Sequence, residues 1–181
     1  MAARKRGRDE GWIEVSVGQC DGYGALSLPL TKAHCTAIGL VMMQWAYIER
    51  EINSEIAWLL SRSENRGRKV SFQKAFSKRV ADWLTLAKRV YKRPAEIAAI
   101  DSIAGKAIAL KADRDDLAHG TFVLQGRKHI FLKFRDGKLI AIPDKFGTAA
   151  DIEQLAHNVA SVGHALLNHQ TVLDRRYRKR P

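Results

Sequence analysis

Cysteine and proline are scarce in this 181-residue chain, which contains two cysteines and four prolines. The cysteines, Cys20 and Cys35, are fifteen positions apart and have no histidine or cysteine at metal-ligand spacing. This pattern excludes a disulfide framework and a zinc module, and it is typical of proteins in a reducing compartment. We therefore expect a cytoplasmic protein with neither a metal site nor a cofactor.

Long apolar runs are also missing. The longest nearly apolar stretch, Ala37 to Ile48, is interrupted by Gln44 and is too short to span a bilayer. The basic N-terminus is not followed by the apolar segment of a signal peptide. With 46% hydrophobic and 28% charged residues, the composition indicates a folded chain of single-domain size without a membrane partner.

Acidic residues are rare at both ends and in one central block, although the whole chain has 19 of them against 31 lysines and arginines, a net charge of +12. Residues 1–8 hold four cations and residues 175–181 hold five, with no acid in either window. The block from Arg62 to Arg93 holds eleven cations against Glu64 and Asp82. Such a field attracts polyanions through counterion release and steering, so nucleic acid is the first partner that we expect, with an anionic membrane or an acidic protein next.

Apolar residues at spacings of three and four predict four helices. The expected helices cover residues 31–60 with Thr31 as N-cap, 71–92, 95–118 with Pro94 in the first turn, and 148–173 with a capping box of Thr148 and Asp151. In the third helix this spacing turns Ile97, Ala104 and Ile108 toward the core.

Between the third and fourth helices the period changes to alternation, which predicts strands over residues 121–125, 129–134 and 139–142, the last two joined by an Asp-Gly turn. The expected fold is mainly α: a four-helix up-and-down bundle over residues 31–173, with a small three-stranded antiparallel β-meander at about 121–142 between helices three and four. Residues 1–30 form a basic N-terminal segment in which we expect a short hairpin, and residues 174–181 form a basic tail that acts as a nonspecific arm.

Charged residues enter the apolar sector near the end of the third helix. At 100° per residue, Asp115 aligns with Ile97 and Arg114 lies beside Ala107. Removing an ion from water costs free energy unless the ion is paired. We therefore expect these charges either to form ion pairs or to take part in the function. His119 lies four residues after Asp115 on the same face, where the carboxylate can fix the tautomer of the imidazole.

Glu49 lies in the apolar stripe of the first helix, four residues after Trp45 and three before Ile52. A carboxylate in that position needs a cation, and we expect Arg114 to supply it. Glu49 then either supports the functional site or serves only as a boundary residue that pairs with a lysine or arginine. Asp113 and Asp116 are expected to be solvated charges at the helix end.

The segment Arg114-Asp115-Asp116-Leu117-Ala118-His119 resembles the Arg-x4-6-His motif of the HEPN superfamily, with Asp115 as the polar residue often found after the arginine. The residues Leu117 to Gly120, followed by a hairpin, are similar to a recurring variant of that group. The resemblance covers about residues 31–173. It implies an α-helical bundle with the motif at the end of the third main helix, and a homodimer in which the motifs of both copies face one cleft.

The resemblance further implies a metal-independent endoribonuclease or an RNA-binding relative. In such an enzyme His119 would move the proton of the 2′-hydroxyl, Asp115 would orient the imidazole, and Arg114 would stabilise the charge that builds on the phosphorane. A toxin or defence effector is the biological role that this activity favours, and a protein inhibitor is then a further partner.

Basic residues of the second helix and of the loop before it are candidate RNA contacts. They are Lys74, Lys78, Lys88 and Lys92 on one side of the helix, and Arg66, Arg68 and Lys69 before it. The alternative is an ordinary solvated face. Two other functions also stay open: a non-catalytic nucleic-acid-binding module, and a regulatory subunit whose long first helix packs against a partner chain.

Overall fold

The computed structural model describes residues 30–62, 75–125, 128–135, 138–142 and 145–178. The chain divides into two compact units. Within the described residues, we call residues 30–40 together with 115–154 the sheet unit, and residues 41–114 together with 155–178 the bundle unit. The hairpin expected within residues 1–30 and the candidate RNA contacts Arg66, Arg68, Lys69 and Lys74 lie outside the described residues.

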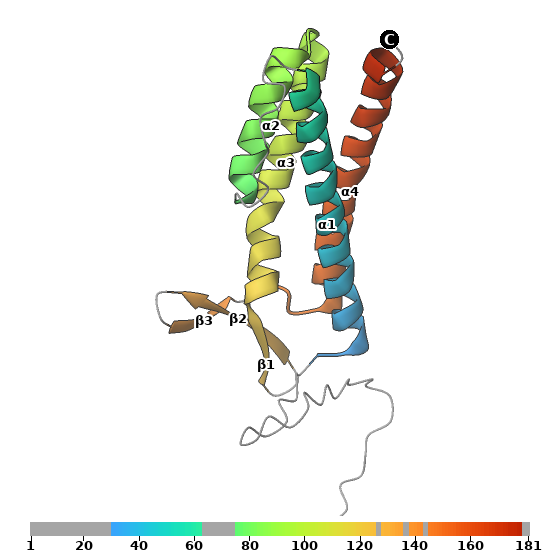
Figure 1. The fold of residues 1–181 in the computed structure, drawn as a ribbon. Coiled ribbons are helices and arrows are strands. Elements are labelled where there is room, and N and C mark those ends of the chain that lie inside the picture. Colours follow the sequence, from blue (N-terminus) through green and yellow to red (C-terminus); the bar gives the residue numbers. More distant parts are fainter. Residues whose placement is uncertain (1–29, 63–74, 126–127, 136–137, 143–144, 179–181) are drawn as a thin grey trace, which may run out of the picture. The chain divides into compact units, whose positions relative to one another are not determined.

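The described residues form helices and strands in the predicted order (Figure 1). They are α1 (Lys32–Arg62), α2 (Phe76–Val90), α3 (Pro94–His119), β1 (Thr121–Gln125), β2 (Lys128–Arg135), β3 (Lys138–Ile142), α4 (Ala149–Leu173) and the short π-helix η1 (Asp174–Arg178). The fold is therefore mainly α, with a three-stranded antiparallel sheet between α3 and α4. Among the described helices, none combines the length and apolarity needed to cross a membrane.

Two helix starts are fixed by the side chains that the sequence predicts. The His34 amide donates a hydrogen bond to Thr31 Oγ1 at 3.3 Å, which makes Thr31 the N-cap of α1. Before α4, the Thr148 amide donates to Asp151 Oδ2 at 2.8 Å and the Asp151 amide donates to Thr148 Oγ1 at 3.2 Å. This reciprocal pair is the capping box, and both predictions are confirmed.

The second helix ends two residues earlier than expected. It stops at Val90 because Tyr91 adopts an extended backbone with ψ of 133°, while the Tyr91 amide still donates to the Ala87 carbonyl at 2.8 Å. The ring of Tyr91 is thereby buried, with 1% exposure. Lys92 follows outside the helix.

The bundle unit packs parts of all four α-helices around one apolar core. Its residues with 1% exposure or less include Trp45, Ile48 and Ile52 of α1, Trp83 of α2, Ile100 and Ala107 of α3, and Val159 and Leu166 of α4. The prediction that Ile108 faces the core is wrong, because its side chain is 39% exposed. Ile100, Ile103, Ala104 and Ala107 form the buried stripe of α3, and Ile108 lies at the margin of that stripe.

The sheet unit has its own aromatic core. The strands pair in the order β1-β2-β3, and the register sets Phe131 opposite both Phe122 and Ile142. Phe131 is 1% exposed, and its ring centroid lies 5.2 Å from that of Phe122 and 5.1 Å from that of Phe146. Phe146 has a positive φ of 59°, a conformation that bulky side chains rarely adopt, and its buried ring holds it there.

The start of the basic tail is folded. Arg176 Nη1 donates to Glu96 Oε1 at 2.7 Å and the Tyr177 hydroxyl donates to Glu96 Oε2 at 2.9 Å. Glu96 is 5% exposed and lies in the first turn of α3. Residues 174–178 of the basic tail are therefore tied to α3, whereas residues 179–181 lie outside the described residues.

Candidate functional site

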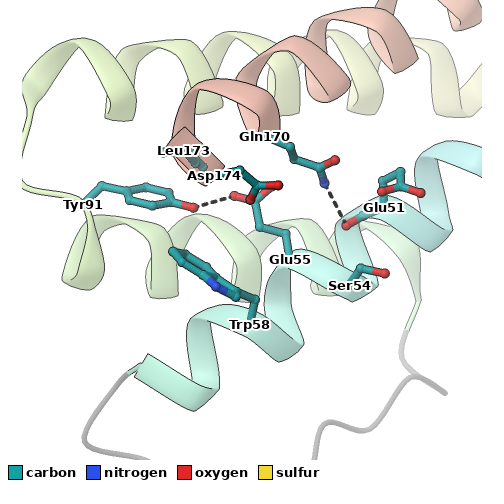
Figure 2. A pocket seen from close by; sticks show the side chains of 8 residues that line it. All are labelled: Glu51, Ser54, Glu55, Trp58, Tyr91, Gln170, Leu173 and Asp174. Carbon is teal, nitrogen blue, oxygen red and sulfur yellow. Dashed lines mark hydrogen bonds between the residues drawn. The ribbon is translucent and has the colours of Figure 1, made fainter. Parts of the chain in front are cut away.

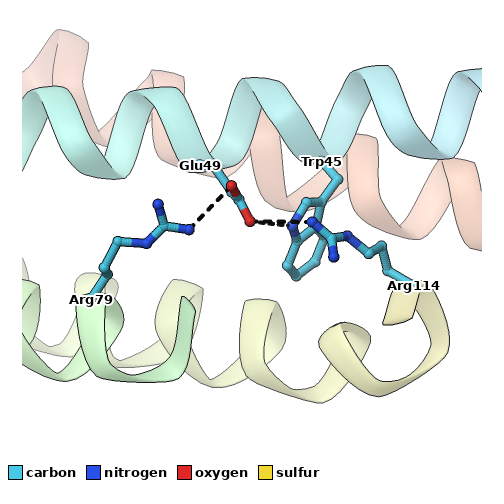
Figure 3. Close-up of polar contacts among 4 residues, drawn as sticks. All are labelled: Trp45, Glu49, Arg79 and Arg114. Carbon is cyan, nitrogen blue, oxygen red and sulfur yellow. Dashed lines mark hydrogen bonds and ion pairs between the residues drawn. The ribbon is translucent and has the colours of Figure 1, made fainter. Parts of the chain in front are cut away.

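Glu49 is the centre of a polar cluster in the bundle unit (Figure 3). Its Oε1 accepts hydrogen bonds from Trp45 Nε1 at 2.8 Å and from Arg114 Nη2 at 3.3 Å. Its Oε2 lies 3.1 Å from Arg79 Nη2 of α2. The predicted ion pair between Glu49 and Arg114 is therefore confirmed, and Arg79 is a second partner that the sequence analysis missed.

Arg114 is held by two different interactions. Besides the ion pair, its guanidinium carbon lies 5.0 Å from the centroid of the Trp45 ring, within the range of a cation–π contact. The Arg114 side chain is 23% exposed, against 12% for Arg79 and 26% for Glu49. All three charged side chains of the cluster are therefore partly accessible at the surface.

Replacement of Glu49 by glutamine is expected to destabilise the protein. The change removes the carboxylate that pairs with both arginines, so each arginine loses its ion pair with Glu49. Hydrogen bonds to charged groups contribute about 1.5–3 kcal/mol, and we expect a loss in this range in urea unfolding. The matched control is Asp101→Asn, which breaks the exposed ion pair with Lys88 and should cost about 0.5 kcal/mol or less. Equal losses in the two variants would contradict a special role for the Glu49 cluster.

The remainder of the motif belongs to the sheet unit, at the C-terminal end of α3. His119 is the last residue of α3 and is exposed, whereas Leu117 is buried with 5% exposure. The Gly120 amide donates to the Asp116 carbonyl at 2.7 Å and closes the helix. A Cβ atom at Gly120 would overlap the Phe131 ring, so the backbone next to His119 is packed directly on the sheet.

Asp116 is buried, which corrects the expectation that it is a solvated charge. It is 7% exposed and forms ion pairs with Lys133 of β2 and with Lys145, whose Nζ lies 2.7 Å from Oδ2. Burial acts to raise the pKa of Asp116, but the hydrogen bonds and charges of the two lysines outweigh it, so the pKa lies below the ordinary value. Asp116 therefore ties the end of α3 to the sheet, and both lysines were missed because they lie far away in the sequence.

The stability contributed by Asp116 is expected to depend on pH. Because its folded-state pKa is lowered, the contribution is present above the unfolded pKa of about 3.9 and is lost as the pH falls through the folded value. We expect Asp116→Asn to be about 1–3 kcal/mol less stable than the native protein at pH 7. The gap should shrink below about pH 4. Urea unfolding at several pH values measures this difference in stability. The control is Glu153→Gln, at an exposed position of α4. A gap that does not change with pH would contradict the ion-paired state.

The other predicted site residues are accessible to different degrees. Asp115 is half-buried in the sheet unit, one residue after Arg114. Lys78 and Lys88 of α2 are exposed and face solvent, as does Lys92, which follows the helix. Lys88 pairs with Asp101 at 3.1 Å, and Lys92 Nζ donates to the Arg89 carbonyl at 3.2 Å. Within the described residues, no group of three or more histidines, cysteines or acids could hold a metal ion.

Two histidines that no sequence pattern marks lie together in the sheet unit. The ring centroids of His34 and His129 are 4.4 Å apart, and His34 Nδ1 lies 2.7 Å from Thr31 Oγ1. Burial lowers the pKa of His34, and the nearby His129 lowers it further. This pair packs the N-terminal turn of α1 against β2.

Comparison of the chain with family models, with curated proteins and with solved structures finds no match. The resemblance to the HEPN superfamily therefore depends on residues 114–120 and on their position at the end of the third helix.

Proposed function

We propose that the protein is a metal-independent endoribonuclease of the HEPN type that acts on RNA at a site shared by two copies of the chain. The observation that carries this proposal is an exposed His119 on a helix end that is packed against the sheet, on the same helix as an Arg114 held by Glu49 and Trp45. The side chains of His119 and Arg114 are therefore attached to a helix whose end is packed against the sheet, and both are at least partly accessible to a ligand.

The chemistry requires a group that exchanges a proton near neutral pH and a cation beside the phosphate. Histidine is the side chain that ordinarily does the first, and His119 would take the proton from the 2′-hydroxyl as it attacks the neighbouring phosphorus. The P–O5′ bond breaks, the leaving 5′ oxygen takes a proton from water, and a 2′,3′-cyclic phosphate remains. Arg114 would stabilise the charge on the phosphorane, because its planar guanidinium can hold two phosphate oxygens.

The charge distribution supports RNA as substrate. The whole chain has a net charge of +12, and the exposed Lys78, Lys88 and Lys92 offer contacts to the phosphate backbone. The exposed apolar Met43 and Ile108, at 64% and 39%, are surfaces on which a second copy can pack. Cytoplasmic location and a role as toxin or defence effector, with a protein inhibitor as partner, complete the proposal.

Incubation of the purified protein with end-labelled RNA in EDTA tests the activity. We expect cleavage products that end in 2′,3′-cyclic phosphate. Intact RNA in a stable complex would instead indicate the second candidate, a non-catalytic nucleic-acid-binding module. That candidate is favoured by one observation: the charge of Arg114 is already balanced in part by Glu49 at 3.3 Å. Sedimentation without RNA tests the shared site, since a strict monomer at high concentration would contradict it.

A further inference from the structure

Exposed basic side chains from four segments of the chain meet at one end of the bundle unit. The C-terminal ends of α1, α2 and α4 and the start of α3 lie at this end (Figure 1). We define the end patch as the exposed cations that these segments place there: Arg62 at the end of α1, Arg89 in the last turn of α2, Lys92 and Arg93 before α3, and Arg175 and Arg176 in η1.

A buried carboxylate fixes η1 at this end. Glu96, in the first turn of α3, is 5% exposed and accepts hydrogen bonds from Arg176 at 2.7 Å and from the Tyr177 hydroxyl at 2.9 Å. The Arg176 side chain remains 43% exposed although it forms this ion pair. Arg175, one residue earlier in η1, is exposed as well. The cations of η1 are therefore held on the bundle unit while they face solvent.

Aromatic rings support this arrangement from below. The Tyr177 ring centroid lies 5.8 Å from that of Tyr91 and 6.3 Å from that of Trp58. Figure 2 shows Trp58 and Tyr91 next to the residues with which α4 ends and η1 begins. The guanidinium carbon of Arg62 lies 5.2 Å from the Trp58 ring centroid, in cation–π range. The rings thus link the end of α1 to η1.

The connection between α2 and α3 lies beside η1. Burial and the hydrogen bond to Glu96 raise the pKa of Tyr177, while the Lys92 backbone and the charge of Arg93 oppose the increase. Lys92 Nζ in turn donates to the Arg89 carbonyl at 3.2 Å. These contacts bring the cations of the connection and of α2 close to those of η1.

The acids at this end do little to compensate the cations at the surface. Glu55 and Glu96 are each 5% exposed, and Asp174 is half-buried. Within the described part of the chain, Arg176 is the only member of the end patch that forms an ion pair. Like charges gathered in this way repel one another and lower the stability of the folded chain, and a bound polyanion would relieve that repulsion.

We propose that the end patch is a second RNA-binding surface, whose guanidinium groups hold phosphates of the RNA backbone. Five of its six cations are arginines, and the planar guanidinium can hold two phosphate oxygens at once. The inference rests on the proposed function for the identity of the ligand, RNA, but not for its cleavage.

The end patch is distinct from the Glu49 cluster. Glu96, which anchors η1, and Arg114 are eighteen residues apart on α3, which corresponds to about 27 Å along the helix. An RNA that contacts both places must therefore extend along the bundle unit.

Fluorescence anisotropy with a labelled, single-stranded 2′-O-methyl oligonucleotide tests the surface, because this probe lacks the 2′-hydroxyl nucleophile and reports binding without cleavage. Arg89→Gln/Arg93→Gln should weaken binding about tenfold or more at 0.1 M salt and reduce the slope of log K against log salt by about 1.4, since each phosphate contact on a single strand contributes about 0.7. The matched control is Lys32→Gln/Lys106→Gln, which removes two exposed lysines outside the end patch and should have a smaller effect. Equal losses in the two double variants would overturn the proposal.

Glu96→Gln separates a built surface from a general attraction by net charge. This variant is one charge more positive, so a general attraction predicts tighter binding. Loss of the anchor of η1 should instead weaken binding, by about threefold or more if one or two phosphate contacts are lost. Native or tighter binding by Glu96→Gln with a native circular dichroism spectrum would contradict the proposal, and if this variant does not fold, the arginine double variant decides.

Two further results separate the possible ligands and the two proposals. Competition by poly-L-glutamate as strong as that by RNA of equal charge would overturn the RNA assignment in favour of an acidic protein. Weaker binding by Arg89→Gln/Arg93→Gln, together with natural RNA that the native protein leaves intact, would support the end patch and contradict the ribonuclease.

Discussion

Replacement of His119 by alanine should lower the rate of RNA cleavage by about 10²–10⁴, the usual contribution of a general acid–base group. In the proposed mechanism the variant loses the group that would take the 2′-hydroxyl proton, while Arg114 and its contacts with Glu49 and Trp45 stay in place. Stability should change little, because the His119 side chain is exposed at the end of α3. Single-turnover cleavage of labelled RNA in EDTA measures the rate, and thermal unfolding measures the stability.

The matched control is His157→Ala, which removes another exposed histidine, on α4. We expect it to cleave RNA at the native rate. The affinity for a fully 2′-deoxy oligonucleotide should be similar in both variants. The lower cleavage rate of His119→Ala would then come from the chemical step and not from binding. Native cleavage by His119→Ala would remove this residue from the mechanism.

Replacement of Gly120 by alanine should be the most destabilising single methyl addition at the motif. The new Cβ would overlap the Phe131 ring and would lie 2.8 Å from the Asp116 carbonyl oxygen. Phe131 is 1% exposed and is enclosed by Phe122 and Phe146, so it has little room to move. Overpacking of this kind costs about 1–3 kcal/mol, and a protein of this size loses about 2–4 °C in Tm for each kcal/mol.

Gly105→Ala provides the matched control on the same helix. A Cβ at Gly105 meets no atom within 4 Å, so alanine should stabilise α3 by about 0.5–1 kcal/mol through its higher helix propensity. The two glycine variants should therefore shift Tm in opposite directions in calorimetry. A Gly120→Ala protein as stable as the native one would mean that the end of α3 is not packed on Phe131 as described.

Local signals in the sequence predicted the helices and strands well. The caps at Thr31 and Thr148 are side-chain hydrogen bonds to nearby backbone, so they can be read from residues three positions apart. The register that pairs Arg135 with Lys138 agrees with the hairpin predicted from the Asp-Gly between them. Glu49 and Arg114 could be paired from the sequence because each charge interrupts an apolar stripe, which leaves few alternatives for compensation.

What the sequence could not predict depends on contacts between distant segments. Asp116 looks like an ordinary helix-end acid until β2 brings Lys133 and the segment before α4 brings Lys145 to it. Glu55 is one of many charges on α1, and only its contact with Tyr91, 36 residues later, identifies it as buried. Periodicity gives the direction of a helix face but not its width, which is why Ile108 was assigned to the core.

A single 2′-deoxy substitution at a mapped cleavage position of an RNA substrate tests the central claim most directly. If the neighbouring 2′-hydroxyl is the nucleophile, activated by His119 and assisted by Arg114, cleavage at that position should disappear while the affinity for the oligonucleotide is unchanged. Undiminished cleavage at the substituted position would show that the nucleophile comes from elsewhere, and it would contradict the assignment of this site as a ribonuclease of the proposed type.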